Sequence, residues 1–448
     1  MNDLTYVYAT AALVIGLVAS QFFRRAFDPF APIWMFLVGY FQVYVVQAIS
    51  YHDWALRVHG EELIEAAGFR SFWALSWFMT VYYSPLGRRI AKLLPGAPAG
   101  WSQVTTGVMV PPLILWGLIS SGLVLATGGG DGDASGAENL LRQFPIFMVV
   151  GGVMLIVSAM HRDPPSPTLR LAGITTTLMY VFIWMLNGKR SHSLIGLLTT
   201  VAAYYISKGT KPPKVVLLVT GVLGAVVVSL ALGWRGNENY ERSVAGFLQY
   251  VTEFNADSIL VNANLASRGE EETAPEKTSK ETEEIGGFYL MMSTVPDKSS
   301  YDYGESYRRL YSTYIPRLIW RDKPIYGRDK WVAAWIAGSE FKRDETFTGP
   351  AIGVLGAAQL NGGAGGTFIV LAILAAILKT AYEYFRLYAH TAWAQVWWPL
   401  TFYNAWLMTV NDDPFIWFYY VYGHTTLPPL AFLWIYNRAL YGSAKASA

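Results

Sequence analysis

Long apolar runs dominate this chain, and short polar or glycine-rich segments separate them. A helix needs about 20 mostly apolar residues to cross the roughly 30 Å hydrocarbon core of a bilayer. The runs do not alternate strictly between apolar and polar positions, and a spanning segment must satisfy its own backbone hydrogen bonds, so each run is predicted to be a helix. The eleven predicted spans are 4–21, 30–50, 71–86, 104–126, 144–160, 171–187, 191–207, 214–233, 364–380, 391–410 and 414–437.

One polar segment is far longer than the others and divides the chain into three parts. Residues 1–233 hold spans one to eight, residues 234–350 form the long loop, and residues 351–448 hold spans nine to eleven. Apolar positions at helical spacing over 243–265 predict an amphipathic helix at the membrane surface. Residues 268–284 are charged and aperiodic, which indicates a solvated segment. The sequence therefore predicts an all-α polytopic membrane protein with one large loop.

The distribution of Lys and Arg predicts the orientation of the spans. Fourteen basic residues follow spans one, three, five, seven, nine and eleven, whereas the alternate short loops hold five. Because cytoplasmic loops carry an excess of Lys and Arg, the first set is predicted to be cytoplasmic. The N-terminus and the 234–350 loop then lie outside and the C-terminus inside. In a bacterial inner membrane, the outside is the periplasm.

Composition supports this reading and excludes several kinds of chemistry. The chain is 53% hydrophobic and 15% charged, whereas soluble proteins carry about 25% charged residues. The formal net charge of +2 gives no basic field for nucleic acid. The absence of cysteine excludes thiolate metal sites, thiol catalysis and disulfides. The first apolar run is preceded only by Asn2 and Asp3, so no cleavable signal peptide is predicted.

Several basic residues fall on the predicted outer side, against the general tendency. Lys189 and Arg190 lie in the short turn between spans six and seven, and Arg235 follows span eight. Arg317, Arg321 and Lys323 cluster in the long loop. Guanidinium groups match phosphate oxygens bidentately and stay charged, as binding an anionic lipid headgroup requires. The alternative is that each is a snorkelling residue or part of a loop salt bridge.

Residues 301–366 resemble a family of membrane enzymes. The segment reads YDYGESYRRLYSTYIPRLIWRDKP and later TFTGPAIGVLGAAQLNGGAGG. It is similar to the loop and following helix of O-antigen polymerases and related oligosaccharide repeat-unit polymerases, and the basic turn at Lys189–Arg190 also resembles that family. The matching positions are Gly304, Ser306, Tyr307, Ile315, Pro316, Arg317, Trp320, Lys323, Pro324, Thr348, Pro350, Gly353, Asn361, Gly363 and Gly366.

The resemblance implies a metal-independent glycosyltransferase without a cofactor. The donor would be a glycan on undecaprenyl diphosphate, and the acceptor a sugar hydroxyl on a second lipid-linked repeat unit. Membrane lipids, a chain-length regulator and a flippase are the implied partners. The product would be O-antigen, capsule or exopolysaccharide.

The resemblance and the charge pattern together suggest roles for individual residues. Preplaced cations can stabilise a leaving diphosphate, so Arg190 and Arg317 are predicted to be catalytic. The acceptor hydroxyl needs a proton acceptor, for which His192 and Glu253 are candidates. For these two, the alternatives are a hydrogen-bonded polar histidine and a solvent-facing helix residue. Substrate binding is predicted for Lys189, Arg235, Arg321, Lys323, Trp320, Tyr307 and Asn361.

Three other functions compete with polymerisation. A flippase for lipid-linked oligosaccharide would use the same cations, but charged residues deep in several spans and two related halves would be expected. A ligase that moves finished glycan to another acceptor shares the donor and the cation chemistry. A non-catalytic assembly subunit would not need basic residues gathered on the outer side.

Overall fold

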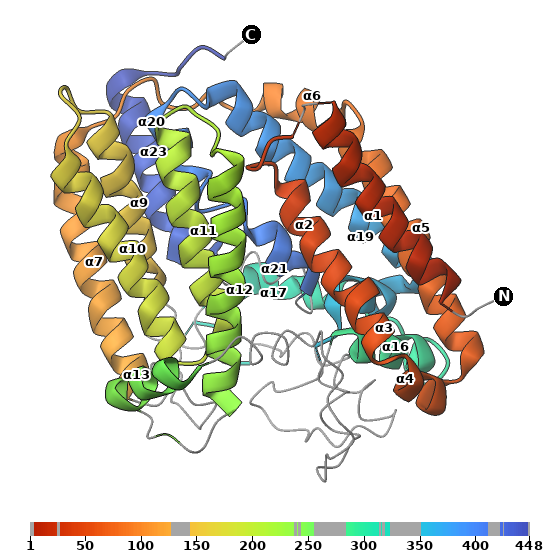
Figure 1. The fold of residues 1–448 in the computed structure, drawn as a ribbon. Coiled ribbons are helices and arrows are strands. Elements are labelled where there is room, and N and C mark those ends of the chain that lie inside the picture. Colours follow the sequence, from red (N-terminus) through yellow and green to blue (C-terminus); the bar gives the residue numbers. More distant parts are fainter. Residues whose placement is uncertain are drawn as a thin grey trace. The chain divides into compact units, whose positions relative to one another are not determined.

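The computed structural model of the chain consists of helices connected by loops (Figure 1). It describes residues 4–24, 27–126, 144–236, 240, 243–254, 284–312, 315, 319–322, 351–410, 422–423 and 425–446. Within these ranges there is no β-strand, only an isolated bridge between Pro98 and Ser443. The predicted all-α class is therefore confirmed for the part of the chain that is described.

Among the described residues, six helices are long and apolar enough to cross a membrane, and α9 (Ile146–Met160) is apolar but shorter. The chain is thus a membrane protein by the length and composition of its helices. The number of spans, eleven, and the full extent of the 234–350 loop stay predictions. The six helical segments are Thr5–Phe23, Pro32–Ser50, Gln103–Ala126, Pro167–Leu186, Lys214–Ala231 and Gly353–Tyr388.

The chain folds into two compact units, each assembled from separate stretches of sequence. Unit 1 comprises residues 1–94, 270–384 and 404–422, and unit 2 comprises residues 95–269, 385–403 and 423–448. The cores of both units are therefore completed by segments that follow the long loop. The helices of unit 1 that precede this loop are α1 (Thr5–Phe23), α2 (Pro32–Phe41), the π-helical turn η1 (Gln42–Gln47), α3 (Ala48–Ser50), α4 (His52–His59), α5 (Glu61–Tyr83) and α6 (Leu86–Leu93).

Aromatic rings join the first helices of unit 1. Tyr6 on α1 meets Phe69 on α5 edge to face at 5.1 Å, and Phe36 on α2 stacks on Phe78 of α5 at 3.7 Å. Aromatic pairs of this kind stabilise packing beyond the area that they bury. The α5 helix begins at Glu61, ten residues before the predicted third span, because Gly60 with φ 81° permits the sharp turn that separates α4 from α5.

A buried helix inside the predicted loop was not foreseen from the sequence. The α16 helix (Glu284–Thr294) packs against the start of α19 (Gly353–Tyr388), and the two share a core. A Cβ built on Gly287 would lie 1.9 Å from the carbonyl oxygen of Ala351, so only glycine permits this approach. The shared core consists of Leu290, Met291, Val295, Ile352, Ala357, Leu360 and the partly buried Tyr301.

The π-helical turn η1 holds the two buried segments in place. Tyr44 Oη accepts a hydrogen bond from the backbone N–H of Leu355 at 2.9 Å. Gln47 accepts one from the N–H of Ile285 and donates another to the Glu284 carboxylate at 2.6 Å. The second predicted span therefore supports the first turns of both α16 and α19.

The α19 helix is broken near one third of its length. Gly362 (φ 160°, ψ 31°) and Gly363 (φ 61°, ψ −132°) depart from helical geometry. A Cβ on Gly366 would lie 2.3 Å from the carbonyl oxygen of Ala358, a contact that a straight helix could not make across eight residues. Residues 353–361 thus form a separate buried helix that meets residues 364–388 at a sharp bend.

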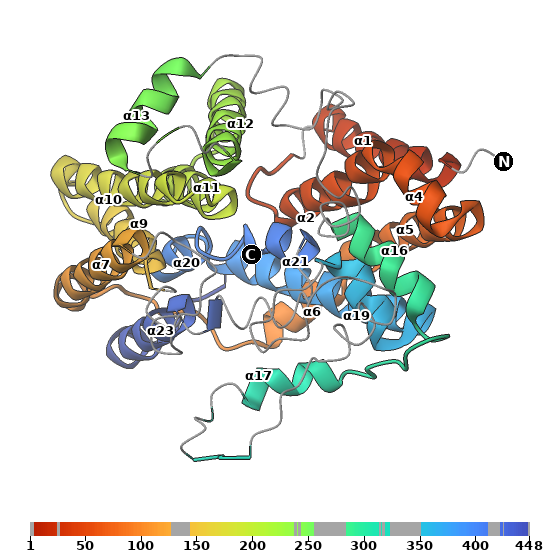
Figure 2. The ribbon, with the colours of Figure 1, turned by 90° about the horizontal axis from the view of Figure 1, so that it is seen from below.

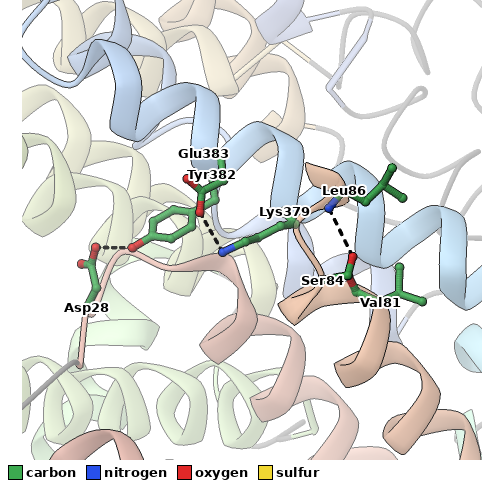
Figure 3. Close-up of polar contacts among 7 residues, drawn as sticks. All are labelled: Asp28, Val81, Ser84, Leu86, Lys379, Tyr382 and Glu383. Atoms are coloured by element: carbon green, nitrogen blue, oxygen red, sulfur yellow. Dashed lines mark hydrogen bonds and ion pairs between the residues drawn. The ribbon is translucent and has the colours of Figure 1, made fainter. Parts of the chain in front are cut away.

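A network of polar side chains surrounds the far end of α19 (Figure 3). The Lys379 ammonium lies 2.8 Å from the Glu383 carboxylate, and both side chains are largely buried. The Tyr382 hydroxyl donates a short hydrogen bond to Asp28, whose other oxygen accepts from the N–H of Phe30. Lys379 also lies over the ring of Tyr82 on α5. The network joins α19, α5 and the segment that leads into α2.

Unit 2 is a separate set of helices, in which α10 packs against both α9 and α11. Figure 2 views α12 along its axis and shows α13 lying crosswise to it. Small residues permit close packing: a Cβ on Gly152 would lie 2.6 Å from Thr177. Its helices are α7 (Gln103–Ala126), α9, α10 (Pro167–Leu186), α11 (Arg190–Ser207), α12 (Lys214–Gly236), α13 (Val244–Glu253), α20 (Ala392–Trp397) and α23 (Leu427–Tyr441).

Two sequence predictions differ from the observed helices. The predicted tenth span at 391–410 is interrupted, because α20 ends at Trp397 and α21 (Asn404–Val410) starts seven residues later in unit 1. Pro399 explains the interruption, since proline lacks an N–H and clashes with the preceding turn of a helix. The amphipathic helix predicted at 243–265 is observed as α13, which ends at Glu253, and the positions after 254 lie outside the described residues.

Candidate functional site

The basic turn of unit 2 joins α10 to α11. Gly188 has φ 65°, and the N–H of Lys189 bonds back to the carbonyl of Trp184 at 3.0 Å. Lys189 is the N-cap of α11 without a side-chain cap, and Arg190 is its first helical residue. Both side chains are half-buried, and no hydrogen bond or ion pair to the Arg190 guanidinium is observed in the described part of the chain. The N-terminus of a helix carries a partial positive charge, which disfavours a cation there. A bound anion beside Lys189 and Arg190 would be stabilised by both charges.

His192 lies in the first turn of α11 and packs against a neighbouring ring. Its imidazole stacks on the Trp184 indole at 4.3 Å, and its Nδ1 is 3.3 Å from Ser191 Oγ. Trp234 of α12 donates from Nε1 to the carbonyl of Leu186 at 2.8 Å. The turn that carries Arg190 is therefore fixed by aromatic packing on one side.

Glu253, the other predicted proton acceptor, lies at the exposed end of α13. Its carboxylate accepts a short hydrogen bond from the Tyr240 hydroxyl and a second from Gln249 Nε2 at 3.1 Å. The hydrogen bond from Tyr240 lowers the pKa of Glu253 below its ordinary value. A stronger acid has a less basic carboxylate, so this environment favours the solvent-facing alternative for Glu253.

The structure describes only some of the remaining residues that the sequence predicted to bind the diphosphate. Arg317 and Lys323 lie outside the described residues, and Arg235 belongs to α12 but its side chain is not described. Arg321 is exposed and Trp320 is partly exposed. The roles predicted for Arg235, Arg317, Arg321, Lys323 and Trp320 stay predictions.

In unit 1, two parts of the sequence motif meet at the break in α19. The N–H of Asp302 donates to the carbonyl of Leu360 at 2.9 Å, which places the segment with Gly304, Ser306 and Tyr307 beside Asn361. The Tyr301 hydroxyl covers Gly363, where a Cβ would lie 2.6 Å from its oxygen. Residues that are about 60 positions apart in sequence thus form one surface at the break.

Arg70 on α5 holds the two parts of α19 together, a role that the sequence did not suggest. Its Nη1 donates to Gln359 Oε1 at 3.0 Å and to Thr367 Oγ1 at 3.2 Å, one acceptor on each side of the break. Both acceptors are neutral, and no carboxylate from the described residues pairs with the guanidinium. Gln359 in turn donates to the carbonyl of Val295 at 2.6 Å, which connects the bend to α16.

Two buried oxygens at the same break accept no hydrogen bond from the described residues. They are Oδ1 of Asp302, a residue only 4% exposed, and Oδ1 of Asn361. The other polar atom of each side chain is occupied: Asp302 Oδ2 accepts from the N–H of Ser306 at 2.9 Å, and Asn361 Nδ2 donates to Ala357 at 2.8 Å. Buried acceptors of this kind are rare in folded proteins, since they lose the hydrogen bonds that water would supply.

A site for a catalytic metal is not evident within the described ranges, where no three His, Cys, Asp or Glu side chains come together. Comparison with models of protein families, with curated proteins and with solved structures gives no match to this chain. Functional inference therefore rests on the residues and their geometry.

Proposed function

We propose that this chain polymerises lipid-linked oligosaccharide repeat units into a surface polysaccharide at the outer face of a bacterial inner membrane. The observation that carries the proposal is the pair of half-buried cations, Lys189 and Arg190, at the N-terminus of α11. Helix dipole and side-chain charge are both positive there, so a diphosphate would be stabilised by both. The type of reaction is inferred from the resemblance of residues 301–366 to repeat-unit polymerases.

In this reaction the glycosidic bond from C1 of the donor sugar to undecaprenyl diphosphate breaks, and the diphosphate gains negative charge. Arg190 would stabilise that charge, and Lys189 would bind the second phosphate, as preorganised cations do in a site with little water. Arg235, Arg317, Arg321 and Lys323 remain candidates for the same diphosphate. Trp320, Tyr307 and Asn361 remain candidates for the glycan.

The direction of two helices supports the proposed topology within unit 1. Arg70 on α5 contacts Thr367, and Tyr82, twelve residues further along α5, contacts Lys379, which is twelve residues further along α19. The two helices therefore run in parallel. Spans three and nine of the eleven-span topology are both expected to run from outside to inside, with the N-terminus outside and the C-terminus in the cytoplasm.

A flippase for the same lipid-linked oligosaccharide is a second candidate. The observation in its favour is the largely buried Lys379–Glu383 pair, because ionisable groups inside membrane helices often belong to a transport pathway. A ligase would share the donor and the cations with the polymerase.

The test is a glycan profile of cells that lack the protein, complemented with the intact chain or with Arg190→Ala. Complementation by Arg190→Ala should yield at least about 100-fold less long polymer, the effect of removing one charge-stabilising donor. Single repeat units on undecaprenyl diphosphate should accumulate outside the inner membrane. Lys208→Ala, at the opposite end of α11, is the matched control and should retain polymer.

Three results would contradict polymerisation. Single units that accumulate on the cytoplasmic side would indicate a flippase. Full-length polymer that remains on its lipid carrier would indicate a ligase. Long polymer at the ordinary level with Arg190→Ala would reject the diphosphate site.

A further inference from the structure

The break in α19 holds a carboxylate, that of Asp302, which accepts a hydrogen bond at one oxygen and has no donor from the described residues at the other. Resting on the function proposed above, we propose that Asp302 is the general base of the transfer and accepts the proton of the acceptor sugar hydroxyl beside Asn361. Neither His192 nor Glu253, the candidates from sequence, has this combination of burial and an available acceptor atom.

The orientation of Asp302 is fixed by its neighbours. Its backbone N–H bonds to Leu360, and its Oδ2 accepts from the N–H of Ser306, so the carboxylate cannot rotate freely. Oδ1 is the atom that no donor in the described part of the chain reaches. A catalytic base needs this arrangement, because one oxygen orients the group and the other receives the proton.

The second unsatisfied oxygen indicates what kind of ligand would be bound. Asn361 Nδ2 is occupied by the carbonyl of Ala357, so the free group of its amide is an acceptor, as in Asp302. Two acceptors call for a ligand that donates hydrogen bonds. Sugar hydroxyls donate, whereas a phosphate at neutral pH mainly accepts, so the glycan of the acceptor fits this position better than its diphosphate.

Open space lies beside Gly362, the neighbour of Asn361, and a ligand would have to enter from there because both oxygens are closed to solvent. A Cβ built on Gly362 would meet no atom within 4 Å, and the same holds for Gly365. Gly362 directly follows Asn361 and stands at the bend itself. A hydroxyl that approaches along Gly362 would reach the bend where both acceptors lie, whereas Tyr301 covers the neighbouring Gly363.

The proposed step is balanced without a cofactor. The acceptor oxygen forms a bond to C1 of the donor sugar, and the bond from C1 to the diphosphate oxygen breaks, with its electron pair leaving on the diphosphate. The proton of the acceptor hydroxyl moves to Asp302 Oδ1 and later passes to solvent or to the departing diphosphate. Asp302 is then ready for the next unit.

The test uses the purified full-length protein in detergent with single lipid-linked repeat units as donor and acceptor. Asp302→Asn keeps an oxygen for the Ser306 N–H but cannot take a proton, so kcat should fall at least about 100-fold while KM changes less than about threefold. Asp302→Glu should retain part of the activity. Asp297→Asn changes an exposed carboxylate in the same segment and is the matched control.

Thermal unfolding separates catalysis from folding. Asp302→Asn should unfold at the same temperature as the unsubstituted protein or higher, because it removes a buried carboxylate that has a donor at only one of its two oxygens. Activity of Asp302→Asn within tenfold of the unsubstituted protein would overturn the proposal. A second result would also overturn it: an unfolding temperature that is higher in sodium chloride than in N-methylglucamine chloride, with the difference lost in Asp302→Asn. The two oxygens would then bind a cation. If the unsubstituted protein joins no units at all, the proposed function itself fails.

Discussion

The buried carboxylates near the two ends of the long helix α19 differ in their hydrogen-bond partners. Near residue 380, the Lys379 ammonium forms an ion pair with the Glu383 carboxylate, and the Tyr382 hydroxyl donates a hydrogen bond to Asp28 (Figure 3). At the break, Asp302 and Asn361 each retain a buried oxygen that no donor in the described part of the chain reaches. Both regions belong to unit 1 and contact the same helix, α5.

The difference separates a structural role from a functional one. Carboxylates that are paired with a cation or a hydroxyl stabilise the position of the helices and have no acceptor left for a ligand. An unsatisfied acceptor lowers stability and persists where a bound partner completes it. The network near residue 380 is therefore expected to govern stability, and the break to govern activity.

The largest expected effect comes from breaking the Lys379–Glu383 pair. Lys379→Met leaves the largely buried Glu383 without its cation, which should lower the free energy of unfolding by about 3–5 kcal/mol. Thermal unfolding in detergent measures this. The double variant Lys379→Met with Glu383→Leu removes both charges and should recover much of the loss. Equal stability of the single and double variants would contradict the assignment of a structural pair.

The bend in α19 offers a second test, with two adjacent glycines as a matched pair. Gly366→Ala places a Cβ 2.3 Å from the backbone oxygen of Ala358, so the two parts of the helix must move apart. The expected loss of stability is about 2–3 kcal/mol. Gly365→Ala meets no atom within 4 Å and should be neutral or slightly stabilising, as alanine favours a helix. Similar effects of the two substitutions would mean that the bend does not constrain the fold.

The sequence predicted the membrane helices well where a single long apolar run crosses without interruption. Spans predicted at 4–21, 104–126 and 214–233 correspond to helices Thr5–Phe23, Gln103–Ala126 and Lys214–Gly236. The α16 helix was missed because it has only 11 residues, whereas a membrane-spanning helix needs about 20. Pro399 was visible in the sequence, yet the apolar residues around it outweighed its helix-breaking signal.

The candidate site was predicted less completely than the helices. The motif around Tyr307 and Asn361 was identified, but its most unusual residue, Asp302, has no distinctive sequence context. Its importance depends on an acceptor oxygen left without a donor, which only three-dimensional packing reveals. Arg70 is one of the five basic residues in the alternate short loops, but its bridge between Gln359 and Thr367 depends on the bend at Gly362 and Gly363, which the sequence did not predict.

Arg70 provides a third, intermediate test of the break. Arg70→Met removes the hydrogen bonds to Gln359 and Thr367 and should lower stability by about 2 kcal/mol, since buried acceptors lose a charged donor. Polymerisation should fall as well, because the bend would no longer be held. Arg88→Met changes an exposed arginine and should alter stability by less than about 0.5 kcal/mol. A stable and fully active Arg70→Met would remove Arg70 from the site.

The smallest expected effect concerns pH and comes from His59, at the end of α4. His59 lies against Trp54 and Tyr289, with ring centroids 5.7 and 5.9 Å away. Burial lowers its pKa from 6.5 to about 4, and the Lys298 ammonium contributes in the same direction. Between these values the unfolded chain binds more protons than the folded chain, so stability falls as the pH falls through this window.

Lowering the pH from 7 to 5.5 should therefore reduce the free energy of unfolding by about 1 kcal/mol through His59. His59→Gln should remove this part of the pH dependence, measured by thermal unfolding at both pH values, whereas the exposed His390→Gln should keep it. Asp302→Asn should also keep it, which separates the acid sensitivity of the fold from the proton transfer proposed at the break. An unchanged slope in His59→Gln would show that another group carries the acid sensitivity.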